Sequence, residues 1–238
     1  MINVEQTNAN SMKSANDFPV SNAPPNIRYI PNFITENEEE ELLNSVYNAP
    51  SVKWEQLRNR RLQNWGGLVS NKGMVADGRP MPTFLTSAID RIMNLPDTFP
   101  VERRPNHVLI NEYKPGQGIM PHSDGPAYFP LISTISLGSH TVLEFYQKGN
   151  VDEDLTLSKR FVGSLLVEPR SLLLINEDAY QMFHGIAERT SDPIDETVFN
   201  RSEKNFGTTL ERGTRVSLTI RNCPKVSKFS VESLLFRR

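Results

Sequence analysis

The chain has 238 residues, which suits one domain of moderate size with a decorated core. Its formal net charge of −2 and pI near 6.1 exclude a global electrostatic attraction to nucleic acid or anionic membrane, so such a partner would need a local basic patch. A single cysteine, Cys223, excludes an internal disulfide, and no stretch approaches the roughly 18 apolar residues of a membrane-spanning helix. With no apolar stretch resembling a signal peptide at the start, these features favour the cytoplasm or nucleus without membrane contact. They do not determine the oligomeric state, for which we expect a monomer.

The N-terminal half predicts a tail and two helices. Residues 1–25 are rich in Asn, Ser, Ala and Pro, and we expect a disordered tail before a single domain over residues 26–238. Thr35 followed by Glu38 is a capping box, which predicts a helix over residues 36–48 that ends before Pro50. A second helix is expected over residues 83–94, and the intervening residues, about 50–80, are expected to form a lid.

From residue 107 the pattern changes to short β-branched or apolar runs separated by Gly, Pro, Asn or charged clusters. The expected strands cover residues 107–113, 131–137, 141–146, 161–167, 171–175 and 214–221. Two helices followed by closely spaced strands predict a mainly β fold with flanking helices, a sandwich or jelly roll, rather than a parallel α/β sheet. Two polar segments, about 147–160 and 188–212, are too hydrophilic for a core and predict surface insertions that lack fixed structure.

A candidate metal site begins at His122 and Asp124, which are two residues apart and share one face of an extended strand. Iron(II) in non-haem oxygenases is bound by two histidines and one carboxylate on one octahedral face. His184 is the best third ligand because it follows an apolar run and a short connection. By itself the His-x-Asp pair also arises by chance, with Asp124 acting only as a turn former before Gly125. We assign no role to the other two histidines.

A candidate anion site lies in the alternating segment 215–221. Arg215, Ser217 and Arg221 share one face of a strand there, and apolar residues occupy the other. If the polar face points inward, the two arginines could bracket a short dicarboxylate, because a guanidinium binds a carboxylate through two parallel hydrogen bonds. The alternative is an ordinary half-exposed strand with its arginines in water.

The joint pattern resembles the signature of the AlkB family of iron(II)- and 2-oxoglutarate-dependent dioxygenases. The matching residues are His122-x-Asp124, His184, Arg215-x₅-Arg221 and the Asn-x-Tyr of Asn111-Glu112-Tyr113. Two further segments resemble the eukaryotic branch called AlkB homologue six. They are Leu62-Gln63-Asn64-Trp65-Gly66-Gly67 and Pro121-His122-Ser123-Asp124-Gly125-Pro126.

The resemblance implies a double-stranded β-helix that uses Fe(II), 2-oxoglutarate and O₂, with His122, Asp124 and His184 as the catalytic metal ligands. It implies that Arg215 pairs with the distal carboxylate of 2-oxoglutarate and that Arg221 lies nearer its metal-bound end. Asn111 and Tyr113 would hydrogen-bond the cosubstrate, and Ser217, which stands where several family members have Asn, shares their face.

The same resemblance implies oxidative demethylation of alkylated nucleic acid, RNA or DNA. A basic stretch over residues 53–65 includes Arg58, Arg60 and Arg61, and it suits a lid that contacts nucleic acid. Trp65 and Tyr128 are expected to stack against an unstacked base. The alternative is that Trp54 and Trp65 pack as core or rim aromatics while the charges of this stretch form a solvated face. Two alternatives stay open: demethylation or hydroxylation of a protein side chain, since Pro126 stands where an acidic base-reading residue often follows, and a nucleic-acid-binding module with little turnover.

Overall fold

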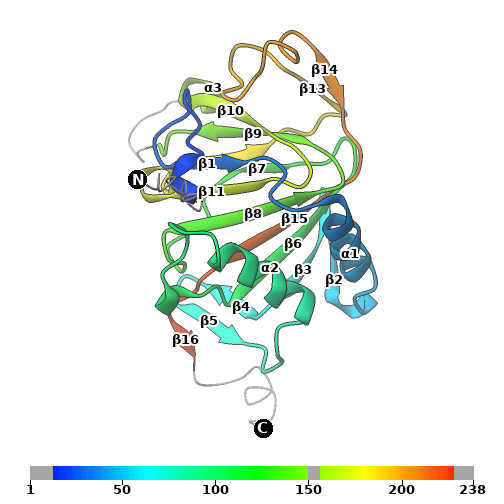
Figure 1. Ribbon diagram of the computed structural model, residues 1–238, viewed down its shortest axis with the longest axis vertical. Coiled ribbons are helices and arrows are strands. Elements are labelled where there is room, and N and C mark those ends of the chain that lie inside the picture. Colours follow the sequence, from blue (N-terminus) through cyan, green and yellow to red (C-terminus); the bar gives the residue numbers. More distant parts are fainter. Residues whose placement is uncertain (1–12, 150–155, 228–238) are drawn as a thin grey trace, which may run out of the picture.

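The computed structural model describes residues 13–149 and 156–227, which form two antiparallel sheets facing each other (Figure 1). The larger sheet has seven strands in the order β1-β11-β8-β15-β6-β3-β2. These strands are β1 (Ile27–Ile30), β11 (Leu172–Asn176), β8 (Leu131–Leu137), β15 (Arg215–Arg221), β6 (His107–Tyr113), β3 (Arg60–Trp65) and β2 (Trp54–Leu57). The smaller sheet has the order β10-β9-β12-β7, with β10 (Phe161–Val167), β9 (Thr141–Tyr146), β12 (Phe183–Ile186) and β7 (Ile119–His122). The mainly β, jelly-roll prediction is confirmed.

Two further sheets and short helices decorate this sandwich. A three-stranded sheet contains β4 (Gly67–Ser70), β5 (Gly73–Ala76) and β16 (Val226–Ser227), and a two-stranded sheet contains β13 (Ser191–Pro193) and β14 (Thr209–Glu211). Two single-turn helices, α3 (Leu157–Arg160) and α4 (Glu177–Tyr180), lie between strands. Among the helices of the described residues, none has both the length and the apolar character needed to cross a membrane.

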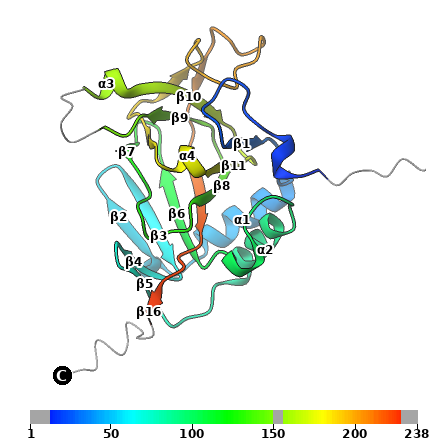
Figure 2. The same cartoon turned by 90° about the vertical axis from the view of Figure 1, so that its left-hand side faces the viewer.

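Two longer helices, α1 (Glu36–Tyr47) and α2 (Thr83–Met93), cover the outer face of the larger sheet (Figure 2). The predicted capping box starts α1: the Thr35 hydroxyl accepts from the Glu38 amide, and the Glu38 carboxylate accepts from the Thr35 amide. In α2 the buried positions Leu85, Ala88, Ile89 and Ile92 recur at helical spacing and pack into the core under the sheet. Burial of each such Leu or Ile side chain stabilises the fold by about 1.5–3 kcal/mol.

The register of the central strand β15 decides which side chains face the second sheet. Arg215 lies opposite Tyr113, Ser217 opposite Asn111, and Arg221 opposite His107. These positions face the space between the two sheets, and the alternate positions belong to the helix-covered core. The latter are Val216, Leu218 and Ile220, each fully buried. The polar face of β15 therefore points inward, as proposed from the sequence.

The expectation of a disordered tail over residues 1–25 is wrong for its second half. A 3₁₀ turn at Ala15–Asp17 has its own capping box from Ser14, and Ala15 is fully buried. The Ala15 amide donates to Pro96 O at 3.0 Å, and the Tyr29 amide donates to Phe18 O at 3.0 Å. This segment is therefore packed on the domain; residues 1–12 of the predicted tail lie outside the described residues.

The expectation that residues 188–212 lack fixed structure is also wrong. Ile194 and Val198 are each 1 % exposed and pack with two residues of the smaller sheet into a core of their own. Asp192, with no exposed surface, binds the Arg212 guanidinium through two hydrogen bonds of 2.7 Å. Charged residues are abundant here because they pair inside the segment. Of the other predicted insertion, α3 is described and residues 150–155 lie outside the described part.

Candidate metal and cosubstrate site

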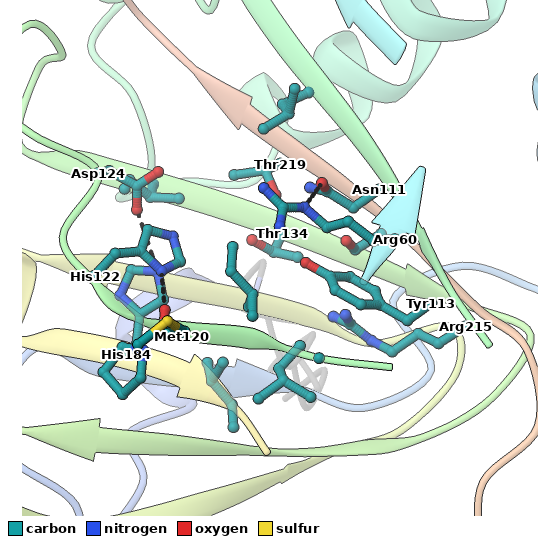
Figure 3. Close-up of a pocket in the computed structure, with 18 of the residues that line it drawn as sticks. Arg60, Asn111, Tyr113, Met120, His122, Asp124, Thr134, His184, Arg215 and Thr219 are labelled. Atoms are coloured by element: carbon teal, nitrogen blue, oxygen red, sulfur yellow. Dashed lines mark hydrogen bonds and ion pairs between the residues drawn. The ribbon is translucent and has the colours of Figure 1, made fainter. Parts of the chain in front are cut away.

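A cavity of about 600 Å³ lies between the two sheets. Its walls come from β6, β8, β11 and β15 of the larger sheet and from β7, β9 and β12 of the smaller one, and the turn between β2 and β3 borders it. Figure 3 shows His122, Asp124 and His184 gathered at one end, with Tyr113 and Arg215 at the other. The cavity thus has two chemically different ends.

The two histidines are brought together by strand pairing. β7 and β12 are antiparallel neighbours, and His122 lies directly opposite His184, with ring centroids 4.8 Å apart. Asp124 follows β7 in a loop, and its Oδ2 lies 3.4 Å from His184 Nε2. The three residues predicted as metal ligands are therefore adjacent, although His184 comes from a distant part of the chain.

Hydrogen bonds orient these groups. His122 Nδ1 donates to the Met120 carbonyl at 2.8 Å, which leaves Nε2 with its lone pair free for a metal. One oxygen of Asp124 is bound by the Arg221 guanidinium. Burial raises the pKa of Asp124, but Arg221 and the two histidines lower it further, so the group stays a carboxylate. Burial lowers the pKa of His184 to about 4, so it is the neutral imidazole that a metal requires.

The donor set fits iron(II): two neutral imidazoles and one carboxylate from one side match the facial arrangement of non-haem oxygenases. Within residues 13–149 and 156–227, however, no group of three His, Cys, Asp or Glu side chains already has the geometry of a bound metal. The Asp124 carboxylate forms an ion pair with Arg221. Because of this ion pair, the carboxylate lies near the two imidazoles but does not point at the same position as they do. His122, Asp124 and His184 would hold the metal after a local adjustment of this side chain.

The far end of the cavity carries a buried cation without an acidic partner. Arg215 is 6 % exposed, donates to Ser136 Oγ at 2.9 Å and lies over the Tyr113 ring at 5.8 Å. Its Nε has no hydrogen-bond partner, and no acidic side chain within the described ranges forms an ion pair with it. Burial lowers its pKa to about 10. A buried guanidinium that is only partly satisfied fits the distal carboxylate of 2-oxoglutarate.

The remaining predicted cosubstrate residues also line the cavity. Asn111 and Tyr113 lie on β6, each at most 6 % exposed, and Ser217 lies beside Asn111 on β15. Burial raises the pKa of the Tyr113 hydroxyl, so it stays a hydrogen-bond donor. Arg221 lies at the metal end beside Asp124. The structure therefore brings together all five residues predicted to bind the cosubstrate.

The predicted substrate residues divide in two. Arg58 and Arg60 line the cavity at the β2–β3 turn. Arg61 points to the opposite face of β3, where it binds Glu112 at 2.7 and 2.8 Å. Trp65 shares that face, is 9 % exposed in the helix-covered core and donates to Gln63 Oε1 at 2.9 Å. Placing Arg61 and Trp65 at the substrate is thus wrong, because side chains alternate along a strand.

Tyr128 is near the metal end without being among the residues that line the cavity. The Arg221 guanidinium lies 4.3 Å from its ring centroid, and the His107 ring lies 5.5 Å away. Its role as a stacking wall stays a prediction. His107, to which we assigned no role in the site, is buried and forms a hydrogen bond with Asn64 Oδ1 at 3.0 Å. This contact gives His107 a structural role.

The site prediction omitted several lining residues, among them Met120, Thr134 and Thr219. Thr219 shares the polar face of segment 215–221, so the alternation that identified Ser217 also indicated it. Thr134 lies on β8 between apolar residues and two serines, Ser133 and Ser136, so its polarity alone did not single it out. Met120 lies two residues before His122, so alternation along the strand also placed it on the His122 face, although its side chain is 79 % exposed.

Comparison with known proteins agrees with this geometry. A family model described as the 2OG-Fe(II) oxygenase superfamily matches residues 26–221. The chain belongs to this superfamily. It is a dioxygenase that uses Fe(II), 2-oxoglutarate and O₂, and the AlkB resemblance is confirmed by its relatives.

Three of these relatives show how far the likeness extends. A Danio rerio protein named "Probable RNA/DNA demethylase ALKBH6" is 49 % identical over 215 residues, which cover 88 % of this chain and 90 % of that protein. "Uncharacterized protein L905" of Acanthamoeba polyphaga mimivirus is 30 % identical over 82 % of this chain and 84 % of its own length. The solved structure of OsALKBH1 superposes with a TM-score of 0.55 over 84 % of this chain and 99 % of that one. At 14 % identity the OsALKBH1 likeness shows the fold alone.

Proposed function

We propose that this dioxygenase oxidatively demethylates alkylated nucleic acid. The observation that carries the proposal is the charge of the cavity. Its lining holds four guanidinium groups, from Arg58, Arg60, Arg215 and Arg221, and one carboxylate, Asp124. The charges of iron(II) and of doubly ionised 2-oxoglutarate cancel each other, so the loaded cavity keeps a surplus of three positive charges. Such a site favours a polyanionic substrate.

The mouth of the cavity also offers apolar contacts for a base. Met120 is 79 % exposed and Leu57 lines the same opening. Arginines beside exposed apolar side chains suit a nucleotide, whose phosphates are anionic and whose base has an apolar face. A base inside a duplex could not reach the histidines, so the target would be single-stranded or turned out of the stack. The name of the 49 % identical relative also supports a nucleic-acid substrate.

Each group of residues would have one task. The chemistry that iron(II), 2-oxoglutarate and O₂ supply together is hydroxylation of a methyl C–H bond, with 2-oxoglutarate converted to succinate and CO₂ and formaldehyde released from the product. His122, Asp124 and His184 would hold the metal. Arg215 would hold the distal carboxylate of the cosubstrate, and Arg58 at the β2–β3 turn would hold the substrate.

The test is a side-by-side assay with iron(II), 2-oxoglutarate and ascorbate. Methylated RNA and DNA oligonucleotides, their unmethylated counterparts and methyl-lysine or methyl-arginine peptides are incubated with the protein, and formaldehyde, succinate and substrate mass are measured. We expect a loss of about 14 Da from a methylated oligonucleotide only. Demethylation of peptides but not oligonucleotides would overturn the choice of polymer. Salt-sensitive RNA binding without any 2-oxoglutarate consumption would instead indicate a binding module.

A further inference from the structure

Arg60 enters the cavity from the lid side. It is the first residue of β3, directly after the β2–β3 turn. Because side chains alternate along the strand, Arg60 points into the cavity, whereas Arg61 points to the other face and binds Glu112. Figure 3 shows the Arg60 guanidinium reaching over the cavity beside Asn111 and Tyr113, two of the residues predicted to bind the cosubstrate.

The contact between Arg60 and Asn111 determines how the Asn111 amide is turned. Arg60 Nε donates to Asn111 Oδ1 at 3.1 Å. A guanidinium only donates hydrogen bonds, so the amide oxygen must face Arg60. The amide NH₂ group is then directed away from Arg60. An NH₂ group in a cavity of this charge is a donor for a carboxylate oxygen, whereas a flipped amide would present a repelling oxygen there.

The turn that carries Arg60 is fastened across the mouth of the cavity. The neighbouring Asn59 side chain donates to the Glu188 carboxylate, which follows β12 of the smaller sheet. Arg58, on the other side of Asn59, lines the mouth. A displacement of this turn by a bound substrate would therefore move Arg60 relative to Asn111.

We propose that Arg60 is a positioning residue for the cosubstrate: it orients the Asn111 amide so that the NH₂ group donates to 2-oxoglutarate, and it thereby links the lid turn to cosubstrate affinity. The proposal rests on the assignment of the cosubstrate site and does not depend on which polymer is demethylated. Arg60 acts through Asn111, so its contribution should vanish when Asn111 is absent.

The test is a double-mutant cycle of Arg60→Met and Asn111→Ala, with 2-oxoglutarate binding measured by calorimetry under anaerobic conditions with manganese(II). Met keeps the length of the side chain and removes its donors. We expect Arg60→Met to weaken binding fivefold to thirtyfold, about 1–2 kcal/mol. In the Asn111→Ala background the same change should alter binding by less than about twofold. Arg60→Lys, which keeps one donor, should recover part of the affinity.

Controls separate a positioning role from a structural one. Arg104→Gln removes a guanidinium from an exposed ion pair with Asp90, outside the cavity, and should leave 2-oxoglutarate binding and thermal stability near wild type. The ligand-free melting temperature of Arg60→Met should also match wild type. In steady-state assays the KM for 2-oxoglutarate should rise more than kcat falls.

Three results would overturn the proposal. Wild-type affinity in Arg60→Met would show that the contact is unused. An equal loss in both backgrounds would show that Arg60 binds 2-oxoglutarate independently of Asn111. Wild-type affinity in Asn111→Ala would remove the residue through which Arg60 is proposed to act. None of these results bears on the methylated polymer, so the proposed function would be judged separately.

Discussion

The buried cation Arg215 should destabilise the protein when no cosubstrate is bound. Its pKa is lowered from 12.5 to about 10, chiefly by burial. For a basic group a lowered pKa means that folding disfavours the charged form, and this penalty is present at any pH well below 10. At about 1.4 kcal/mol for each pKa unit, the penalty at pH 7 is roughly 3 kcal/mol.

The perturbation is Arg215→Met, which removes the charge and keeps most of the apolar volume. The variant loses the hydrogen bond to Ser136, worth about 1 kcal/mol, so the net gain in the free energy of unfolding is about 2 kcal/mol. For a chain of this size that gain corresponds to a rise of about 4–8 °C in melting temperature. The same change removes charge-assisted hydrogen bonds to the distal carboxylate, which should weaken 2-oxoglutarate binding about 100-fold.

The assay is thermal unfolding of wild type and variant with and without 2-oxoglutarate, followed by circular dichroism. Wild type should melt at a lower temperature than the variant without ligand and should gain stability with it, whereas the variant should not respond to 2-oxoglutarate over the same concentration range. A variant that is less stable than wild type by 2 kcal/mol or more, or one that keeps the full response to 2-oxoglutarate, would refute the reasoning. The first result would mean that Ser136 and Tyr113 already satisfy the guanidinium, and the second that Arg215 does not bind the distal carboxylate.

Three further predictions concern other parts of the molecule. His122→Ala should abolish iron-dependent succinate formation while the protein stays folded, because the side chain is partly exposed; normal succinate yield would exclude it as a ligand. Asp192→Asn should lower the free energy of unfolding in urea by about 3–5 kcal/mol, because it leaves Arg212 buried without a countercharge. Burial raises the pKa of Asp192, but hydrogen bonds from His140 and two arginines lower it well below its usual range. The stabilisation by the ionised Asp192 should therefore be lost in wild type as the pH falls below about 4. It should be missing from the variant at any pH. Trp65→Phe should lower the melting temperature by several degrees through the lost bond to Gln63 and leave oligonucleotide binding in a filter assay unchanged; weaker binding at unchanged stability would restore it to the substrate surface.

Long strands of the sandwich could be located from the sequence because both of their faces are buried. The predicted ranges 107–113, 131–137, 141–146 and 161–167 coincide with β6, β8, β9 and β10. Each is a run of mainly apolar or β-branched residues between turn-forming clusters, and burial on both faces keeps such a run continuous. The larger part of the core was therefore predictable.

The short strands that carry the metal ligands were not predictable in the same way. β7 and β12 have four residues each, and β7 contains Pro121 while β12 contains Gly185, residues that normally argue against a strand. β7 lies at the edge of its sheet, where a proline is tolerated. β7 is held by its pairing with β12, and β12 also pairs with β9; both pairings are long-range information. His184 was identified only because the pair His122 and Asp124 needs a second histidine to complete an iron(II) site.

Two errors share a different cause, the phase of a strand. In β3 the residues Arg60 to Trp65 include polar side chains on both faces, so no alternation indicates which of them point to the cavity. Arg60 and Arg61 are indistinguishable by charge, yet one reaches Asn111 and the other binds Glu112 on the opposite face. Pairing of β3 with β6 sets the phase, and a shift by one residue would exchange the two arginines.

The strand β15 shows why an alternating pattern alone could not settle the function. The same sequence of polar and apolar residues would suit an edge strand with one face in water, where the arginines stay hydrated and carry no desolvation penalty. Here β15 lies between β8 and β6 in the middle of the larger sheet, with a second sheet in front and two helices behind. On this central strand with both faces covered, Arg215 and Arg221 are only 6 % and 5 % exposed, and burial of unpaired cations opposes folding. Arg221 is matched by Asp124, whereas Arg215 is matched by no acidic group of the described chain, so the balancing charge must come with a ligand. The position of the strand in the sheet therefore turns an ordinary pattern into evidence for an anion-binding site.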